Sequence, residues 1–383
     1  MRLLLVTREL CADRKYGLGQ AVGQIAAGLR SKGHEVHYLS QAECAASHDR
    51  YAPHVRRVLC PFGGLAAPWA ERLVQGGCGA RMAATLGVTH VWFHDPWLAF
   101  GFFLYQRLHA GWRRPSFKIV ISQHGLGSFA WAVMQDGVRM SQRLFRFLLG
   151  LERRILLAAD CVHFPSYAAL SAALRDFQFV CAPKHFVVLG YGRPKLSIPP
   201  KEEARVSLGL PVQGPVILSM GRLAPVKRFD VIGRAIEHLE REYGLAAQWV
   251  LAGDGDVRHL RLAELTLSLE PRISPAEDVD LWLAAADAYV SACAVESYGL
   301  ANREAVAAGL PAIAACGGAS CEVLGRGAWL VPAECNTLAS ALHAVLTQPK
   351  VASFWRQQAV AESASWPDWD ALIRDYEQLL LMA

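Results

Sequence analysis

Short apolar runs alternate with helix-length segments along most of this chain. The apolar runs lie at 3–6, 35–39, 88–93, 118–122, 161–164 and 186–188, and then at 216–220, 248–252, 288–290, 312–315 and 328–331. Helical patterns stand out at 20–31, 229–241, 256–268, 301–308 and 337–346. Buried strands that alternate with helices predict an α/β fold, in which helices cover both faces of parallel sheets.

A proline-rich break divides this alternation into two runs. Pro194, Pro199 and Pro200 stand among charged residues between 192 and 205. Such a break predicts a boundary between two doubly wound domains, which we place at 1–192 and 193–365. Because ligands of such sheets bind beyond the carboxyl ends of the strands, we expect the active site in a cleft between the two domains.

The charge of the chain is uneven. Its 383 residues carry a net charge of +5, but residues 1–192 hold 22 basic and 11 acidic side chains (+11), whereas residues 193–383 hold 17 and 23 (−6). A basic half indicates an anionic partner, or else a basic surface that is only solvated. A hydrophobic content of 53% excludes a disordered chain. No nucleic-acid-binding motif accompanies the basic half, so we predict no nucleic-acid partner.

Targeting and metal-binding signals are weak in this sequence. The first residues turn polar at Thr7 and acidic at Glu9, too early for a signal peptide, and no uninterrupted apolar run approaches the roughly 20 residues that span a bilayer. The ten cysteines form no Cys-x-x-Cys pair, which predicts free thiols in a reducing compartment and no structural metal. We therefore expect a cytoplasmic protein.

Two loops of the second domain carry charged residues directly after predicted strands. The first loop sets Arg222 and Lys227 five residues apart before a helix. Such a pair suits a diphosphate, because Arg binds it as a fork and Lys as a point charge. In the other loop Glu296 and Glu304 enclose a turn at Gly299, with Glu304 expected in the first turn of the next helix. The two carboxylates could act as general acid and base or as acceptors for sugar and ribose hydroxyls, or Glu304 could only complement the helix dipole.

Two glycine-containing motifs have competing interpretations. Asp254 and Asp256 could hold a divalent metal on a diphosphate, but the glycines around them favour a strand-to-helix turn in which Asp acts as a local cap. Gly17 and Gly19 resemble part of a dinucleotide fingerprint, yet ten residues separate them from the preceding strand and no acidic residue ends the second strand. They predict a glycine loop at a helix N-terminus that approaches a phosphate or sugar.

Histidines follow two strands of the first domain. His94, with Asp95 after it, follows the strand that ends at Phe93, and His124 follows the strand that ends at Ser122. A single histidine is usually structural, but two at cleft-facing strand ends indicate a functional pair.

Taken together, these loops resemble those of the retaining glycosyltransferases of the GT-B fold, family 4 type, also called glycosyl transferases group 1. The resemblance covers most of the chain and rests on GHEV (33–36), the HG pair (124–125), GRLAPVK (221–227), LAGDGD (251–256), AADAYVSACAVESYGLANREAVAAGLP (284–310) and GGASCEVL (317–324). Its most specific part is the pair of glutamates with seven residues between them, joined to GRLxxxK. The resemblance implies two Rossmann-like domains, of which the first binds the acceptor and the second the nucleotide sugar. It also implies that a C-terminal helix at about 366–383 crosses back to the first domain.

The resemblance implies a role for each matching residue of the second domain. Arg222 and Lys227 would bind the diphosphate of the donor, and Glu304 would bind its ribose. Glu322 matches a position that supports the donor site. The donor sugar and its phosphate would be bound by Glu296 and by the backbone amides of Tyr298, Gly299 and Leu300.

The roles implied for the first domain concern the sugar and the acceptor. His124 would lie on the donor-sugar side of the acceptor cleft, and the loop at Gly17 and Gly19 would approach the diphosphate. His94 and Asp95 are candidates for contacting or supporting the acceptor. Of these residues His124 joins Glu296, Arg222 and Lys227 in the expected catalytic set. The family uses no metal or other cofactor, so the nucleotide sugar is the expected co-substrate.

The chain departs from the family pattern at several positions. Residues 292–295 replace the usual proline-serine, Arg228 stands where a glycine is usual, and Gly190-Tyr191-Gly192 replaces an asparagine-glycine-valine-aspartate turn. The donor base, the sugar and the acceptor are not predicted. Two alternatives to a transferase remain open: a nucleotide-sugar epimerase of the same fold, and a catalytically silent glycan- or nucleotide-binding protein.

The basic first half suggests what kind of acceptor the chain serves. The segment 139–154 puts five arginines among Leu and Phe, and 97–114 adds further apolar and basic residues. A basic amphipathic surface can lie on an anionic membrane, which favours peripheral attachment and a glycan or lipid-linked acceptor. The alternative is that the apolar faces belong to the core and the arginines are only solvated.

Overall fold

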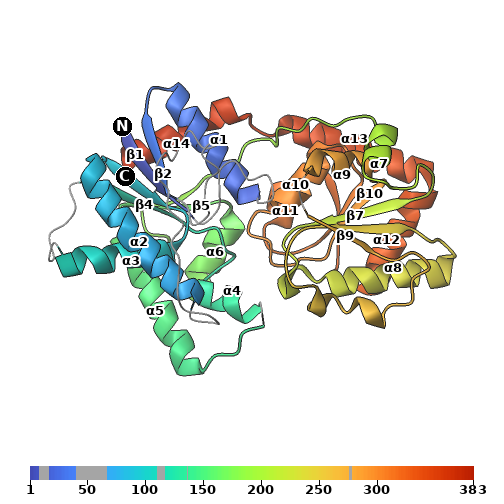
Figure 1. Cartoon of the computed structure of the whole chain (residues 1–383), viewed down its shortest axis with the longest axis horizontal. Helices are drawn as coiled ribbons and strands as arrows, with labels where there is room; N and C mark the ends of the chain where they lie inside the picture. Colours follow the sequence, from blue (N-terminus) through green and yellow to red (C-terminus); the bar gives the residue numbers. More distant parts are fainter. Residues whose placement is uncertain (8–16, 40–66, 110–116, 136, 276–277) are drawn as a thin grey trace. The chain divides into compact units, whose positions relative to one another are not determined.

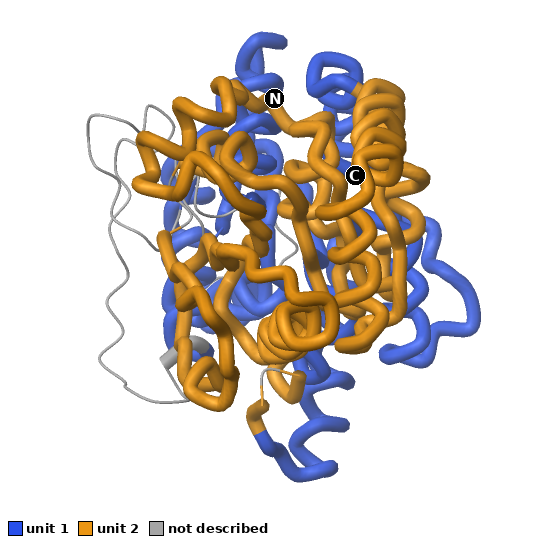
Figure 2. The backbone as a smooth tube through the Cα atoms, turned by 90° about the vertical axis from the view of Figure 1, so that its right-hand side faces the viewer, with its two compact units in different colours: residues 1–132, 139–191, 368–383 blue, residues 133–138, 192–367 orange. Residues whose placement is uncertain are grey.

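The computed structural model of the chain describes residues 1–7, 17–39, 67–109, 117–135, 137–275 and 278–383. The chain divides into two compact units, drawn in different colours in Figure 2. Unit 1 comprises Met1–Ala132, Arg139–Tyr191 and Asp368–Ala383, and unit 2 comprises Val133–Val138 and Gly192–Pro367.

Unit 1 is built on a parallel sheet of six strands with the order β2-β1-β3-β4-β5-β6 (Figure 1). The strands are β1 (Arg2–Val6), β2 (Glu35–Leu39), β3 (His90–Phe93), β4 (Lys118–Ser122), β5 (Cys161–Phe164) and β6 (Phe186–Val188). The connecting helices are α1 (Gly17–Ser31), α2 (Ala67–Leu86), α3 (Pro96–His109), α4 (Phe129–Gln135), α5 (Gln142–Ala158) and α6 (Tyr167–Asp176). The predicted α/β class and parallel strands are therefore confirmed for this part of the chain.

Both faces of the unit 1 sheet are buried, as strand β3 shows. Val91 and Phe93 point into the cluster formed with Phe102 of α3 and Leu148 of α5. Trp92, between them, points to the other face and meets Tyr376, with ring centroids 5.8 Å apart. Successive side chains of a strand face opposite sides of the sheet, so a strand covered on both sides is mainly apolar, and a polar side chain such as His90 needs a hydrogen-bond partner.

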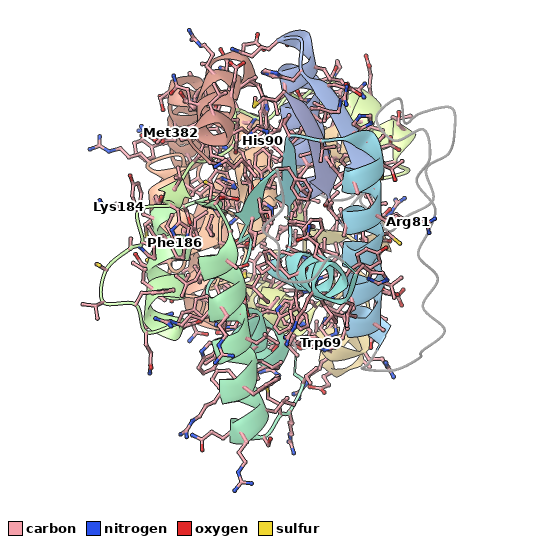
Figure 3. The ribbon with its side chains drawn as sticks, turned by 90° about the vertical axis from the view of Figure 1, so that its left-hand side faces the viewer. Trp69, Arg81, His90, Lys184, Phe186 and Met382 are labelled. Atoms are coloured by element: carbon pink, nitrogen blue, oxygen red, sulfur yellow. The ribbon has the colours of Figure 1, made fainter. Side chains whose placement is uncertain are left out.

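The C-terminal helix α14 (Trp369–Met382) covers one face of unit 1. His90 Nε2 donates to the backbone carbonyl of Leu380 at 3.0 Å, and Figure 3 shows His90 close to the end of this helix. On α1, Gly28 has no room for a side chain, because a Cβ there would lie 2.3 Å from Ile373 of α14. The expectation that a C-terminal helix crosses back to the first domain is thus confirmed.

Unit 2 repeats the same architecture with the strand order β12-β11-β10-β7-β8-β9, again all parallel. Its strands are β7 (Val216–Met220), β8 (Gln248–Ala252), β9 (Arg272–Ser274), β10 (Ala288–Ser291), β11 (Ala312–Ala315) and β12 (Ala328–Val331). Its helices are α7 (Lys201–Ser207), α8 (Phe229–Tyr243), α9 (Val279–Ala285), α10 (Leu300–Ala307), α11 (Ser320–Leu324), α12 (Cys335–Thr347) and α13 (Pro349–Ser365).

The prediction of a helix at 256–268 is wrong. That segment forms two single 3₁₀ turns, η3 (Val257–Leu260) and η4 (Leu262–Glu264), separated by Arg261 at φ 52°. Carboxylates of the neighbouring helix α8 take the hydrogen bonds that a helix would have made internally. Glu237 accepts from the amide of Thr266 at 2.7 Å, and Glu240 accepts from that of Ser268. The short edge strand β9, which follows, was not expected either.

Helices α2 and α3 pack so closely that two glycines are required at their contact. A Cβ on Gly76 would lie 2.2 Å from the carbonyl oxygen of Leu98, and one on Gly101 would lie 2.4 Å from that of Leu73. Gly77, next to Gly76 on α2, would instead place its Cβ at an ordinary 3.4 Å from Tyr105.

We predict that Gly101→Ala lowers the free energy of unfolding by about 1–3 kcal/mol, because the two helices must move apart. Gly77→Ala is the matched control: it is neutral or stabilising by up to about 1 kcal/mol, because Ala favours a helix over Gly. Urea denaturation of the two variants measures the difference. Equal effects would contradict the close packing of the two helices.

Candidate active site

The cation loop of unit 2, residues 221–227, is held by backbone contacts to the loop after β8. Gly221 donates to the carbonyl of Ala252 at 3.0 Å, and Leu223 donates to that of Asp254 at 2.8 Å. A Cβ on Gly253 would lie 1.9 Å from the carbonyl oxygen of Gly221, so only glycine allows this approach. Arg222 lies between the two fixed positions with an exposed side chain.

Lys227 and Glu296 form an ion pair between two loops of unit 2. The Lys227 ammonium donates to Glu296 Oε1, and the exposed fractions of the two side chains are 23% and 12%. Burial opposes the charge of Lys227, but the carboxylate of Glu296 outweighs it, with the result that the pKa of Lys227 is raised. Lys227 is therefore a permanent cation, balanced by Glu296, and residues 69 positions apart are brought together.

The loop that carries Glu296 is also held through its backbone. Its carbonyl oxygen accepts from the amide of Ala319 at 2.8 Å. Gly318 has φ 54° and passes so close to Glu296 that a Cβ would lie 2.3 Å from the same oxygen. The GGAS segment thus forms a close backbone contact that orients Glu296.

Helix α10 follows Gly299, which has φ 72° as the sharp turn requires. The sequence predicted Glu304 in the first turn of this helix. The helix begins at Leu300, so Glu304 lies beyond the first turn, and the prediction is wrong on this point. Its position does not suit the interpretation that it only complements the helix dipole, because that effect falls off within the first turn.

Arg303, which the sequence analysis did not single out, connects several parts of this region. It is 2% exposed and donates to the Tyr298 hydroxyl at 2.9 Å and to the carbonyl of Gly192 at 3.1 Å. Its guanidinium lies 4.1 Å from the ring centre of Trp366. In the sequence, only its place between Glu296 and Glu304 could have indicated that Arg303 connects these parts.

The Asp254–Asp256 turn has the local role that the glycines favoured. Asp256 caps η3 by accepting from the amide of Arg258 at 3.0 Å, and it also binds the Arg258 side chain. Because of these hydrogen bonds, the pKa of Asp256 is lowered to about 2. Glu322, in α11, has an exposed side chain.

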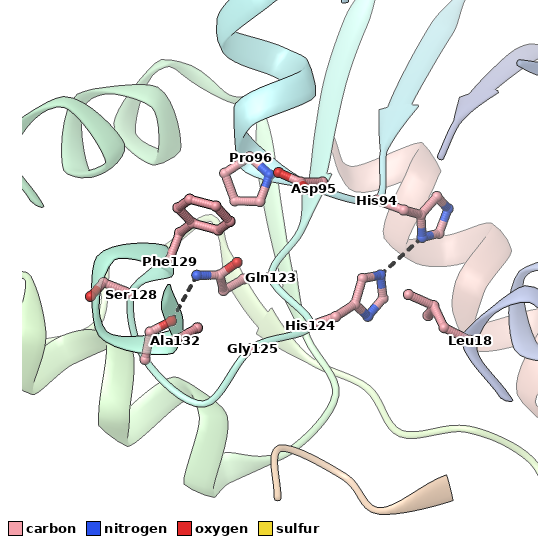
Figure 4. A pocket seen from close by; sticks show the side chains of 11 residues that line it. Leu18, His94, Asp95, Pro96, Gln123, His124, Gly125, Ser128, Phe129 and Ala132 are labelled. Atoms are coloured by element: carbon pink, nitrogen blue, oxygen red, sulfur yellow. Dashed lines mark hydrogen bonds between the residues drawn. The ribbon is translucent and has the colours of Figure 1, made fainter. Parts of the chain in front are cut away.

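A second group of the predicted residues lines a pocket of about 160 Å³ in unit 1. His94, Asp95 and His124 line it together with Leu18 of α1, whose side chain points toward both imidazoles (Figure 4). Gly17 and Gly19 flank Leu18 in the first turn of α1, and not in a loop before it as expected. The residues that precede them, 8–16, lie outside the described part.

Asp95 has a local structural task at this pocket. One carboxylate oxygen accepts from the amide of Trp97 at 2.8 Å, at the start of α3, and the other accepts from Arg72 Nε at 2.8 Å. Arg72 is 5% exposed and lies 4.8 Å from the ring centre of Phe129. This pair joins α2 to the pocket wall.

The pocket histidines belong to a buried chain of hydrogen bonds. His94 Nδ1 and His124 Nε2 lie 3.1 Å apart, and His124 Nδ1 lies 2.7 Å from the hydroxyl of Tyr191. Burial lowers the pKa of His94 to about 3 and lowers the pKa of His124 well below 6.5. Both rings are therefore neutral at physiological pH, and both nitrogens of His124 already have partners within the protein.

Glu152 of α5 is a fully buried carboxyl beneath the same pocket. It accepts from Gln123 Nε2 and from the amide of Phe129, both at 3.0 Å. Gln123 also donates to the carbonyl of Gly127 at 2.8 Å, so Glu152 orders the turn that follows His124 (Figure 4). Burial raises the pKa of Glu152 to about 8. In the sequence, Glu152 is only one acidic residue in an amphipathic helix, and nothing singles it out.

Comparisons with known proteins agree with the two-unit layout. The family profile described as "Glycosyl transferase 4-like domain" matches residues 16–192, and the profile "Glycosyl transferases group 1" matches residues 214–348. The chain belongs to the group 1 glycosyltransferases. The predicted family is thus confirmed, and its members are enzymes of class EC 2.4 with the GT-B fold.

Particular relatives of this glycosyltransferase are more distant. It is 37% identical over 120 residues to a D-inositol 3-phosphate glycosyltransferase of Xylanimonas cellulosilytica. This match covers 30% of the chain and only 29% of the relative's length. The sucrose-phosphate synthase of Thermosynechococcus elongatus superposes with a TM-score of 0.76 over 99% of this chain and 98% of the other, at 20% identity. Anabaena HepE, solved with UDP and glucose, superposes with a TM-score of 0.75 over 100% and 99% at 16% identity. Such structural likeness at low identity supports the fold.

Neither a metal-binding cluster nor a membrane-crossing helix is present among the described residues. In that part of the chain, no three His, Cys, Asp or Glu side chains gather as a metal site would need. No helix among the same residues combines the length and the apolar character needed to cross a bilayer.

The buried Glu152 predicts a pH-dependent effect on stability. Because its pKa is raised from 4.5 to about 8, the folded state holds the Glu152 proton at pH values where the unfolded state releases it, and its contribution to stability falls as pH rises from 4.5 to 8. Gln cannot ionise, so the free energy of unfolding of Glu152→Gln should rise relative to that of the parent protein by at least about 2 kcal/mol between pH 5 and pH 8.

Urea denaturation across this pH range measures that difference. Glu203→Gln, at an exposed position on α7, is the control. Its free energy of unfolding should differ from that of the parent protein by the same amount at every pH. A pH-independent offset for Glu152→Gln would mean that the buried carboxyl is ionised throughout.

Proposed function

We propose that this glycosyltransferase moves a sugar, with retention of configuration and without a metal, from a nucleotide diphosphate sugar to a hydroxyl acceptor. The observation that carries the proposal is the contact between Lys227 and Glu296, because it joins the two most specific motifs of the family at one place. The domain roles follow from the family: unit 2 binds the donor and unit 1 receives the acceptor.

The cation loop is the proposed diphosphate site. When the bond between the anomeric carbon and the phosphate oxygen breaks, negative charge grows on the departing diphosphate. Arg222 and Lys227 are cations on a backbone held at Gly221 and Leu223, so once the diphosphate is bound they stabilise this charge with little further reorganisation. The diphosphate would replace Glu296 as the partner of Lys227. That exchange would free the Glu296 carboxylate to accept from hydroxyls of the donor sugar.

The other donor contacts come from the same loop and its helix. The amides of Tyr298, Gly299 and Leu300 would bind the sugar phosphate, Glu304 would accept from the ribose hydroxyls, and Glu322 would support the site. The acceptor hydroxyl attacks the anomeric carbon on the face that the phosphate leaves, and its proton passes to the departing phosphate oxygen. No protein nucleophile is required.

In unit 1 the pocket of His94, Asp95 and His124 is the proposed place for the sugar and the acceptor. His124 would contact the donor sugar, and the first turn of α1 at Gly17 and Gly19 would approach the diphosphate. Structural relatives support a nucleotide donor: Anabaena HepE has been solved with UDP-glucose as well as with UDP and glucose. They leave the acceptor open.

A donor screen tests the proposal. Purified protein is incubated with uridine, guanosine and adenosine diphosphate sugars in the presence of EDTA, and the release of nucleoside diphosphate is followed. We expect release from one donor, reduced about 100-fold in Lys227→Met and in Glu296→Gln. Lys350→Met, at an exposed position on α13, is the matched control and should keep full activity.

Binding of UDP alone separates the two roles. Lys227→Met should weaken UDP binding, whereas Glu296→Gln should not, since the carboxylate competes with the diphosphate for Lys227. Neither release nor binding with any donor would contradict the proposal and favour a silent binding protein. Conversion of the donor to an epimer without an acceptor would favour the epimerase.

We further propose peripheral attachment to an anionic membrane, where a lipid-linked acceptor would be available. The first turns of α5 support this: Leu144 is 46% exposed and Phe147 is 64% exposed, beside the exposed Arg143 and Arg146. Farther along the helix, Leu148, Ile155 and Leu156 are buried, so the core alternative holds for that part. Residues 110–114 of the other basic stretch lie outside the described part.

Flotation with vesicles of anionic phospholipid at low salt tests this attachment. We expect binding that falls sharply for a Leu144→Ser, Phe147→Ser double variant and with rising salt. The control is a Val206→Ser, Val212→Ser double variant, which changes two exposed apolar side chains of unit 2. Absence of binding at low salt would exclude the membrane proposal and leave the transferase proposal intact.

A further inference from the structure

Two cysteines of unit 2, Cys316 and Cys321, have their sulfur atoms in contact. Cys316 directly follows β11, and Cys321 lies in the first turn of α11. Their Sγ atoms are 3.5 Å apart, and both side chains are exposed. In the part of the chain that the structure describes, this is the only contact between two thiols. Nothing in the proposed function gives this pair a task.

The pair is placed for the formation of a disulfide. The two sulfur atoms of a disulfide lie about 2.0 Å apart, so those of Cys316 and Cys321 need to approach by about 1.5 Å. Because both side chains are exposed, an oxidant in solution can reach either sulfur directly. The bond would close a ring of the chain from residue 316 to residue 321.

The residues inside this ring support the loop that carries Glu296. The amide of Ala319 donates to the carbonyl of Glu296 at 2.8 Å. A Cβ on Gly317 would lie 2.5 Å from the carbonyl oxygen of Ala294. One on Gly318 would lie 2.3 Å from the carbonyl oxygen of Glu296. Because these contacts leave no free space, a shift of the segment either moves the Glu296 loop or breaks its hydrogen bond.

Both ends of the ring are attached to the rest of unit 2. The amide of Cys316 donates to the carbonyl of Val331 in β12 at 2.8 Å. After Cys321, the side chains of Val323 and Leu324 in α11 are buried. Since both ends are held, we expect the backbone between the two cysteines to move when their sulfur atoms approach.

We propose that Cys316 and Cys321 are a reversible redox pair, which is oxidised to a disulfide by a small disulfide from solution. One thiolate of the pair attacks a sulfur of the small disulfide, which releases one small thiolate and leaves a mixed disulfide. The second protein thiol loses its proton, attacks the mixed disulfide and releases the other small thiolate. Two protein thiols are thereby oxidised to one disulfide, and the small disulfide is reduced to two thiols.

The consequence for the enzyme is a slower transfer in the oxidised form, because the disulfide displaces the loop of Glu296. This consequence rests on the proposed function, in which the Glu296 carboxylate accepts from hydroxyls of the donor sugar. The formation of the disulfide does not rest on it.

Mass spectrometry detects the disulfide without any substrate. The full chain is incubated with oxidised glutathione, blocked with iodoacetamide and digested with trypsin without reduction. The tryptic peptide 304–326 contains Cys316 and Cys321 and no other cysteine. The hydrogen bond to Cys316 raises the pKa of the Cys321 thiol, so the incubation is at pH 8, where more of the attacking thiolate is present.

We expect the peptide 304–326 to lose two hydrogen atoms and to take up no iodoacetamide. Dithiothreitol should restore both thiols. Cys316→Ser and Cys321→Ser each leave one thiol, so the same peptide should stop at a mixed disulfide with glutathione. Cys181→Ser, which removes an exposed cysteine of unit 1, is the matched control and should form the disulfide as the parent does. Two alkylated thiols, or a persistent mixed disulfide in the parent protein, would overturn the proposal.

Kinetics with the donor found in the screen test the consequence. Oxidation should lower kcat/KM at least about tenfold in the parent protein and in Cys181→Ser, since a displacement of about 1 Å can cost about 100-fold in rate. Dithiothreitol should restore the activity. A Cys316→Ser, Cys321→Ser double variant should be as active as the reduced parent and should keep that activity under the same oxidation.

Two results would overturn the regulatory part of the proposal. One is unchanged kcat/KM in the oxidised parent. The other is an equal loss in the double variant, which would assign the inactivation to another thiol, such as the buried Cys293 near Lys227. If no donor is found, the proposed function fails, whereas the mass spectra still decide whether the two cysteines form a disulfide.

Discussion

Both sheets of this protein consist of parallel strands that are buried on their two faces, and this burial determines where charged side chains can stand. Strand β10 is buried over its whole length, and so is β7, so neither offers a place for a charged side chain within the sheet. Because parallel strands end at the same edge, the loops after them become neighbours. Arg222 and Lys227 follow β7 and Glu296 follows β10, which is why residues distant in sequence form one ion pair. The same rule places His94, His124 and Tyr191 together in unit 1.

Glycines turn this neighbourhood of loops into a fixed geometry. Gly253 lets the backbone of the cation loop approach that of the Asp254 turn, and Gly318 does the same for Glu296. A charged side chain on a freely moving loop would lose entropy on binding, whereas a loop tied by backbone hydrogen bonds has lost it during folding. The glycines therefore contribute to the site although they have no chemistry of their own.

Much of the fold and the grouping of the unit 2 loops could be predicted from local sequence. Apolar runs defined the strands, and the motif around Lys227 and Glu296 identified the family. The segment 256–268 was mispredicted because its leucines suggested a helix, while its amides bind Glu237 and Glu240 of another helix. Tyr191 and Glu152 depend on contacts between residues 67 and 23 positions apart, and such contacts leave no pattern in a single sequence.

We propose that the cation loop of unit 2 binds the diphosphate of a nucleotide sugar by exchanging the partner of Lys227. A crystal structure of the protein with the nucleoside diphosphate released in turnover tests it most directly. We expect a phosphate oxygen within hydrogen-bonding distance of Lys227 Nζ, with the Glu296 carboxylate released from that contact. A nucleotide bound elsewhere, or a Lys227–Glu296 pair that stays intact beside the bound diphosphate, would contradict it.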